Sequence, residues 1–431
     1  MITLVLIGVA SGIALLSVPA IQSWQRRYKE VRLLTGHRRE HLHALWYGNF
    51  DEVRAALNDT DDANQMFVRA CAELEAGDCE TAEDFAGHIS ADDPAVKVLV
   101  NLIARRKSRP DEVWLDALEH SWQSAYRPSL LGNKFANSDL VSSHLDAWEG
   151  DVLDGTDHVL WTAMSVKTKI TGAVYPREVR LWAMASDAGE RDLGELIITN
   201  NLIALDTFGD GTPRMLVNVR DRLNELAPEN LWVRLGHCIA HEDRAALRPT
   251  DVDALAQCID APSVDATLGG AAIRRFDAVG DRAKVPHPIV ASQHASNLCV
   301  LLLPLQGLWH RLGETRSYSL RQRAAEILVQ LSRRMREDRT VFSAVAAYET
   351  MRQANTVLMS ARLAGELEAR HVEHRHFLSI AGHLVLNPYA WPIPSLVHEA
   401  AAAERDNELE FYRRHLGDPN AALPQAWLIQ R

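Results

Sequence analysis

The chain has 431 residues, of which 47% are hydrophobic and 24% are charged, and this balance is typical of a folded globular protein. Its formal net charge of -11 argues against nucleic acid as a partner of the whole molecule. The five cysteines are scattered without a Cys-x-x-Cys pair, which predicts free thiols in a reducing compartment and excludes the common zinc and redox motifs.

The N-terminal residues predict a membrane anchor. Met1 to Ile21 carry no charged side chain, and about 20 apolar residues are the length that a helix needs to cross a bilayer. Residues 24–39 are basic, and positively charged flanks stay in the cytoplasm. We therefore predict a single transmembrane helix over 1–23 and a juxtamembrane segment over 24–39. The residues expected at the membrane interface are Trp24, Arg26, Arg27, Tyr28, Lys29 and Arg32.

The same segment allows two alternatives to a simple anchor. A cleaved signal peptide would explain the small residues Val18 and Ala20, but no positively charged start precedes the apolar run, and this favours the anchor. Gly8 and Gly12 form a Gly-x-x-x-Gly motif, which lets two helices approach closely in lipid and would pair two copies into a homodimer. Gly is also common in unpaired spanning helices, so both states of the anchor stay open.

Residues 40–125 contain a repeated pattern. The run from Leu45 to Val53 recurs 29 residues later from Leu74 to Ala82, and a third copy begins at Arg109. Each copy predicts a helix, a turn at Gly or Pro, and a second helix that opens with acidic residues. One such hairpin cannot bury its own apolar face, so we expect the copies to stack.

The turns Gly48-Asn49 and Gly77-Asp78 resemble the helix–turn–helix hallmark of tetratricopeptide-type repeats. An N-terminal anchor followed by such repeats also resembles the plan of bacterial inner-membrane assembly adaptors. The resemblance implies a helical scaffold in the cytoplasm whose partners are other proteins, held at the inner membrane by one spanning helix.

Helical periodicity continues to the C-terminus, and we predict an all-α fold. A middle helical domain is expected over 126–260, in which Thr212-Pro213 and Pro249-Thr250-Asp251 have the residue types that open helices. Residues 261–293 are rich in Gly and Pro and predict a loop-rich linker. A C-terminal helical domain is expected over 294–431, where residues 318–336 place apolar side chains on one face.

One cluster in the C-terminal domain has the residue types of a metal site. The candidate ligands are Glu368, His371, Glu373 and His376, which form two Glu-x-x-His pairs. The pairs begin five residues apart and therefore point to faces about 140° apart on one helix, so they cannot build a single site. An exposed charged helix face is the preferred interpretation, and no metal or other cofactor is predicted.

No phosphate-binding loop and no nucleophile elbow occurs in the sequence. The leading hypothesis is therefore a membrane-anchored scaffold that binds protein partners along stacked helices, without catalysis. The alternative is an enzyme with a site in the C-terminal helical block, possibly metal-dependent. A cleft in which histidines and carboxylates converge would favour the enzyme, whereas one lined by aromatic residues and arginines would favour the adaptor.

Overall fold

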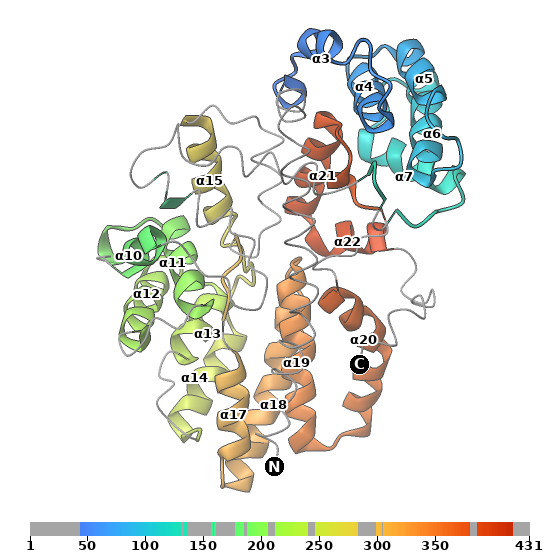
Figure 1. Ribbon diagram of the computed structural model, residues 1–431. Coiled ribbons are helices and arrows are strands. Elements are labelled where there is room, and N and C mark those ends of the chain that lie inside the picture. Colours follow the sequence, from blue (N-terminus) through green and yellow to red (C-terminus); the bar gives the residue numbers. More distant parts are fainter. Residues whose placement is uncertain are drawn as a thin grey trace. The chain divides into compact units, whose positions relative to one another are not determined.

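The computed structural model describes residues 44–130, 133–136, 157, 159–160, 177–184, 188–205, 212–239, 246–282, 299–303, 305–379 and 386–416. These residues form helices and no β-strand, which confirms the predicted all-α fold (Figure 1). The chain divides into two compact units, Met1–Ile89 and Ser90–Arg431.

The predicted anchor over 1–23, with the Gly8–Gly12 motif, and the juxtamembrane segment over 24–39 lie outside the described residues. Within the part of the chain that is described, no helix combines the length and the apolar composition that crossing a bilayer requires. The anchor and the interface residues therefore stay predictions.

The first unit is built from helical hairpins. Its helices are α3 (Phe50–Ala56), α4 (Ala63–Glu75) and α5 (Cys79–Gly87), and α4 packs against both of the others. Aspartates cap α4 and α5. Asp62 accepts hydrogen bonds from two N–H groups in the first turn of α4, and Asp78 accepts one from the N–H of Thr81 in α5. The buried apolar side chains include Leu45, Val53, Phe67, Cys71, Leu74, Ala82 and Ala86.

The two predicted glycine turns of this unit have the same geometry. Gly48 and Gly77 have φ angles of 72° and 86°, in the left-handed region that glycine adopts without strain. At each turn the glycine N–H bonds to the carbonyl three residues back, and the next N–H bonds to the carbonyl five residues back, at 2.8 to 3.1 Å. This pair of backbone hydrogen bonds is the Schellman motif, which ends one helix and redirects the chain into the next. The predicted turns are confirmed, and helical repeats are compatible with the structure.

The second unit contains the remaining helices. Its α-helices are α6 (Pro94–Ser108), α7 (Trp114–Ser124), α10 (Arg177–Met184), α11 (Leu193–Leu205), α12 (Thr212–Leu226), α13 (Leu231–Ile239), α14 (Pro249–Ile259), α15 (Ala271–Arg282), α17 (Leu305–Glu314), α18 (Tyr318–Met335), α19 (Val341–Leu358), α20 (Ala361–Ser379), α21 (Pro394–Asp406) and α22 (Glu408–Leu416). The helices expected from Thr212, from Pro249 and over 318–336 are present as α12, α14 and α18. The expected loop-rich range 261–293 contains α15, so its described part is only partly loop.

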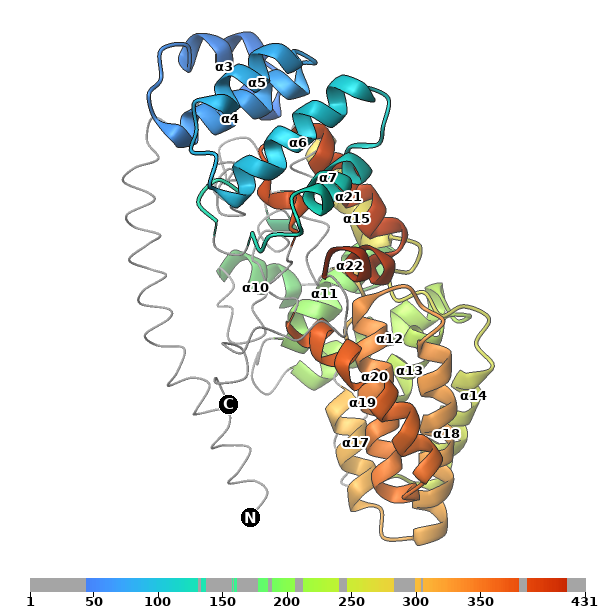
Figure 2. The same cartoon turned by 90° about the vertical axis from the view of Figure 1, so that its right-hand side faces the viewer.

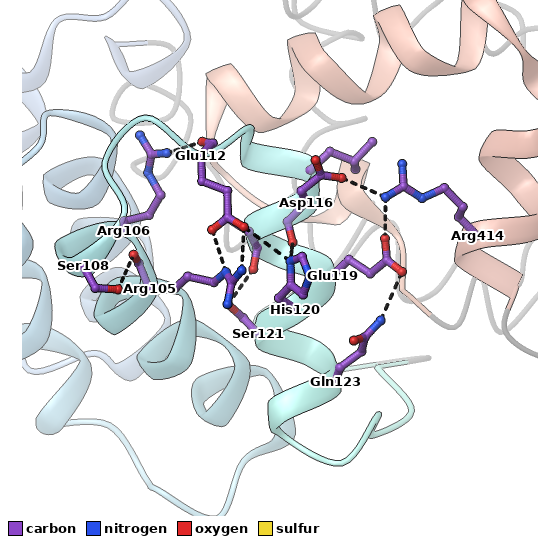
Figure 3. A network of polar contacts seen from close by, with 12 residues as sticks. Arg105, Arg106, Ser108, Glu112, Asp116, Glu119, His120, Ser121, Gln123 and Arg414 are labelled. Carbon is purple, nitrogen blue, oxygen red and sulfur yellow. Dashed lines mark hydrogen bonds and ion pairs between the residues drawn. The ribbon is translucent and has the colours of Figure 1, made fainter.

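The third predicted copy of the repeat is also a helical hairpin, formed by α6 and α7, but α7 begins later than the sequence suggested. Pro110 and Glu112 lie in the turn between the helices, where the Glu112 N–H bonds to the Arg109 carbonyl, and α7 starts at Trp114. The Glu112 carboxylate instead receives two 2.6 Å hydrogen bonds from Arg105 of α6 (Figure 3). The acid closes the hairpin rather than opening its second helix.

The C-terminal helices pack back onto this hairpin. Arg414 of α22 donates hydrogen bonds of 2.8 Å to Asp116 and to Glu119 of α7 (Figure 3). Glu399 of α21 accepts a hydrogen bond from the N–H of Leu115 at the first turn of α7. Segments almost 300 residues apart in the sequence are therefore neighbours within the second unit.

The C-terminal block places α19 in contact with both α18 and α20, and the three helices run side by side (Figure 2). Thr340 caps α19 by accepting a hydrogen bond from the Ser343 N–H, and Ser317 caps α18 in the same way. At the α18–α19 contact, the buried Ser332 hydroxyl of α18 donates a hydrogen bond of 2.7 Å to the Ala347 carbonyl of α19. These three helices, with α22, form the walls of the site described next.

Candidate functional site

A cleft of about 100 Å³ opens between α18, α19, α20 and α22. Its apolar lining includes Ala344, Met351 and Leu409, and the arginines Arg336, Arg370 and Arg413 also line it. We call it the arginine cleft. Arg336 is the C-cap of α18, whereas Arg370 projects from α20 and Arg413 from α22, so three separate helices supply the charge.

The lining of the cleft carries more positive than negative charge. Glu373 is the acidic residue of the lining, and it pairs with Arg413 at 2.7 Å. The side chains of Arg336 and Arg370 form no ion pair or hydrogen bond with the residues that the structure describes. Burial lowers the pKa of Arg370, Glu373 opposes this shift, and the like charge of Arg413 adds to it. The negative charge of an anion in the cleft would oppose both effects and stabilise the charged form of Arg370.

One wall of the cleft is a stack of His374 on Tyr348. The rings are 3.9 Å apart and nearly parallel, and His374 is only 6% exposed. Its Nε2 lies 2.9 Å from the Glu349 carboxylate, while its Nδ1 has no hydrogen-bond partner in the described part of the protein. Burial alone would raise the pKa of Glu349, but hydrogen bonds from His374 and Arg352 outweigh it and leave that pKa below its ordinary value. Glu349 therefore stays ionised and fixes the orientation of the imidazole ring.

Three of the four candidate metal ligands of the sequence have described side chains, and these three have separate surroundings. Glu368 is exposed, His371 lies 3.2 Å from the Tyr348 hydroxyl, and Glu373 is paired with Arg413. The side chain of His376 is outside the described residues. No group of three or more potential metal ligands occurs among the side chains that the structure describes.

The sequence did not predict the arginine cleft. Residues 316–339 are rich in arginine, but several of these side chains form exposed ion pairs, such as Arg333–Glu366 and Arg323–Asp253, as in an ordinary solvated helix face. Arg370 lies inside the histidine-rich run but was not singled out. Nothing in the local sequence indicates that Arg413 would lie beside these residues.

No protein-family model, no curated protein and no solved structure matches this chain. The functional conclusion therefore depends on the geometry of the protein itself.

Proposed function

We propose that this protein is an adaptor that binds an acidic segment of a protein partner in the arginine cleft. The observation that supports it is the convergence of Arg336, Arg370 and Arg413 from three helices, with Glu373 as the acid within the lining. Arginine presents a planar fork that pairs with a carboxylate through two parallel hydrogen bonds, which gives orientation as well as attraction.

The size of the cleft favours a side chain of a partner over a small-molecule substrate. Pockets for small molecules usually enclose about 300–1,000 Å³. At about 100 Å³ the cleft holds a carboxylate and a few carbon atoms beside it. The apolar part of its lining suits the stem of a glutamate or a neighbouring apolar residue of the partner. That part is formed by Ala344, Ala347, Met351, Leu367 and Leu409.

The helical hairpins of the first 125 residues support the same class of function. The Gly48 and Gly77 turns have identical hydrogen-bond patterns, as expected for repeated units of a scaffold. We propose, on the resemblance to tetratricopeptide-type repeats, that these hairpins offer a second protein-binding surface. No catalytic step is assigned to either part.

A binding experiment with the full chain in detergent tests the cleft. A fluorescent peptide that alternates Glu and Leu is titrated with the protein, and a peptide of the same length with Gln in place of Glu is the neutral comparison. We expect the acidic peptide to bind more tightly and its affinity to fall with salt. Arg370→Ala should weaken binding by roughly tenfold to a hundredfold, because a charge-assisted pair contributes about 1.5–3 kcal/mol.

The matched control is Arg362→Ala. Arg362 lies on the same helix α20 with a side chain that is 82% exposed, and it does not line the cleft, so the same loss of charge should leave binding nearly unchanged. Arg370→Lys keeps the charge without the planar fork and should give an intermediate affinity. Equal effects of Arg362→Ala and Arg370→Ala, or equal binding of the neutral peptide, would contradict a specific acidic site.

The enzyme hypothesis makes the opposite prediction about metal content. Stoichiometric zinc or iron in the purified protein, lost on His376→Ala while peptide binding is unchanged, would move the assignment to a metal-dependent enzyme in the C-terminal block. An adaptor should keep its peptide affinity in that variant and carry less metal than protein.

We further propose that residues 1–23 anchor the adaptor in the inner membrane with the repeats in the cytoplasm. The support is the uncharged run and the basic segment that follows it. A reporter fused after Arg431 should then behave as cytoplasmic, and the native N-terminus should be intact. A mature chain that begins near Ile21 would contradict the anchor and support a cleaved signal peptide.

A further inference from the structure

Two cysteines that are 20 positions apart in the sequence lie next to each other in the second unit. The Sγ of Cys238, near the end of α13, is 3.7 Å from the Sγ of Cys258, near the end of α14. All five cysteines are free thiols. A separation of 3.7 Å is van der Waals contact between sulfurs, whereas a disulfide needs about 2.05 Å, so the pair is reduced but within reach of a bond.

The two thiols have different surroundings. Cys258 is buried and its thiol also lies 3.4 Å from the Ala254 carbonyl, whereas Cys238 is partly exposed. The hydrogen bond to Cys238, and then burial, raise the pKa of Cys258. The hydrogen bond from Cys258 lowers the pKa of Cys238, and burial and the charge of Asp251 oppose this shift without cancelling it. Cys238 is therefore the thiol that is both reachable and readier to ionise.

We propose that Cys238 and Cys258 form a dithiol that hydroperoxides oxidise reversibly to a disulfide. The Cys238 thiolate attacks the distal oxygen of the hydroperoxide, the O–O bond breaks, and the leaving alkoxide or hydroxide takes a proton, which leaves a sulfenic acid on Cys238. The Cys258 sulfur then attacks the Cys238 sulfur, the S–O bond breaks, and the thiol proton and hydroxide leave as water. Two thiols lose two electrons in total, and the peroxide gains them.

The local structure permits this closure. Both cysteines are the penultimate residues of their helices, where the backbone is held by fewer intrahelical hydrogen bonds than in a helix centre. The Arg234 guanidinium also reaches from α13 to the Gln257 carbonyl at 3.3 Å, which keeps the two helix ends together while the thiols react. The new bond would link α13 to α14 covalently and close a loop of about 20 residues.

Oxidation of the full-length protein in detergent tests this proposal. The protein is treated with hydrogen peroxide under native conditions, the remaining thiols are alkylated, and a non-reducing digest is analysed by mass spectrometry. We expect a peptide pair linked through Cys238 and Cys258, with a mass about 2 Da below the sum of the reduced peptides. Dithiothreitol should restore both thiols, and the oxidised protein should melt at a higher temperature than the reduced one.

Single substitutions separate the roles of the two sulfurs. Cys258→Ser removes the resolving thiol, so the sulfenic acid should persist on Cys238 and be trapped by dimedone. Cys238→Ser should abolish both the disulfide and the dimedone adduct at this pair. Cys79→Ser is the control, because Cys79 is a partly exposed cysteine of the first unit. This substitution should leave the disulfide unaffected. The proposal is overturned if natively folded wild-type protein keeps both thiols alkylatable after peroxide, or if Cys238 becomes linked to another cysteine instead.

Discussion

Gly48 and Gly77 occupy the same position in two successive helix–turn–helix units, with φ angles of 72° and 86° and the same pair of backbone hydrogen bonds. Apart from the adjoining residues of the chain, no heavy atom lies within 4 Å of where a Cβ would be at either site, so the constraint comes from the backbone conformation and not from crowding. A residue with a Cβ would adopt the left-handed conformation at either turn only at a cost in free energy.

Gly77→Ala should therefore destabilise the α4–α5 hairpin by about 1–2 kcal/mol. Gly87→Ala is the matched control, because Gly87 ends α5 with an ordinary φ and open space around it and should be neutral or slightly stabilising. Hydrogen exchange of the α4 and α5 amides measures the difference locally, which avoids assuming two-state unfolding of the whole chain. Equal exchange rates in the two variants would show that the turn conformation is not what the glycine provides.

Glu73 is the buried acid of the first unit and binds two arginines. Its side chain is 2% exposed and accepts from Arg69 at 2.6 Å and from Arg54 at 2.8 Å. Glu73→Ala leaves the buried Arg69 without its counter-charge and Arg54 with only its exposed pair to Asp51, and should cost about 3–5 kcal/mol. Asp51→Ala removes only an ion pair from Arg54 to a side chain that is 98% exposed and should cost less than about 0.5 kcal/mol. Hydrogen exchange of the α4 amides, measured at increasing urea concentration, distinguishes the stability losses of the two variants.

Asp338 joins three parts of the second unit through one carboxylate. Its Oδ2 accepts hydrogen bonds from the Trp232 indole at 3.2 Å, the Ala266 N–H at 2.9 Å and the Ser343 hydroxyl. Asp338→Ala leaves the buried Ala266 N–H unsatisfied, whereas Trp232 keeps its bond to the Val264 carbonyl and Ser343 keeps its bond to Thr340. The substitution should lower the free energy of unfolding of this unit by about 1–3 kcal/mol. Asp338→Asn keeps one acceptor oxygen and should cost less. An exposed neighbour provides the comparison, since Glu337→Ala removes only its pair with Arg334 and should leave the urea midpoint almost unchanged.

Glu408 gives the second unit a specific pH dependence. Burial and the charge of Glu404 raise the pKa of Glu408 to about 8, from an ordinary value of 4.5. The folded state therefore holds a proton that the unfolded state has already lost, so the stability from Glu408 is fully present below pH 4.5 and is lost as the pH rises through about 8. Glu408→Gln keeps an oxygen to accept from the Val341 N–H and removes the titration, so its stability should change less between these pH values.

The check is the melting temperature of wild type, Glu408→Gln and the exposed control Glu410→Gln, each measured from pH 5 to pH 9. The control should follow the wild-type curve. A Glu408→Gln curve parallel to that of the wild type would show that Glu408 does not carry the pH dependence.

The amino-acid sequence by itself determined those features that depend on residues within one or two helical turns. The turns at Gly48 and Gly77, the helix from Pro249 and the helix over 318–335 each follow from a glycine, a proline or an apolar periodicity that is visible locally. Even here, Glu112 shows the limit, because an acid near a proline predicts a helix start and instead pairs with Arg105 across a turn.

Only the tertiary structure decided which side chains meet. Arg336, Arg370 and Arg413 come from three helices, and their convergence depends on how α18, α20 and α22 pack, which no spacing in the sequence expresses. The same holds for Cys238 and Cys258, whose contact requires the ends of α13 and α14 to lie together. A helical pattern specifies which face of a helix is apolar, but the partner and the angle at which that face packs are set by the whole core. The polar and reactive groups of the proposed sites are placed by that packing.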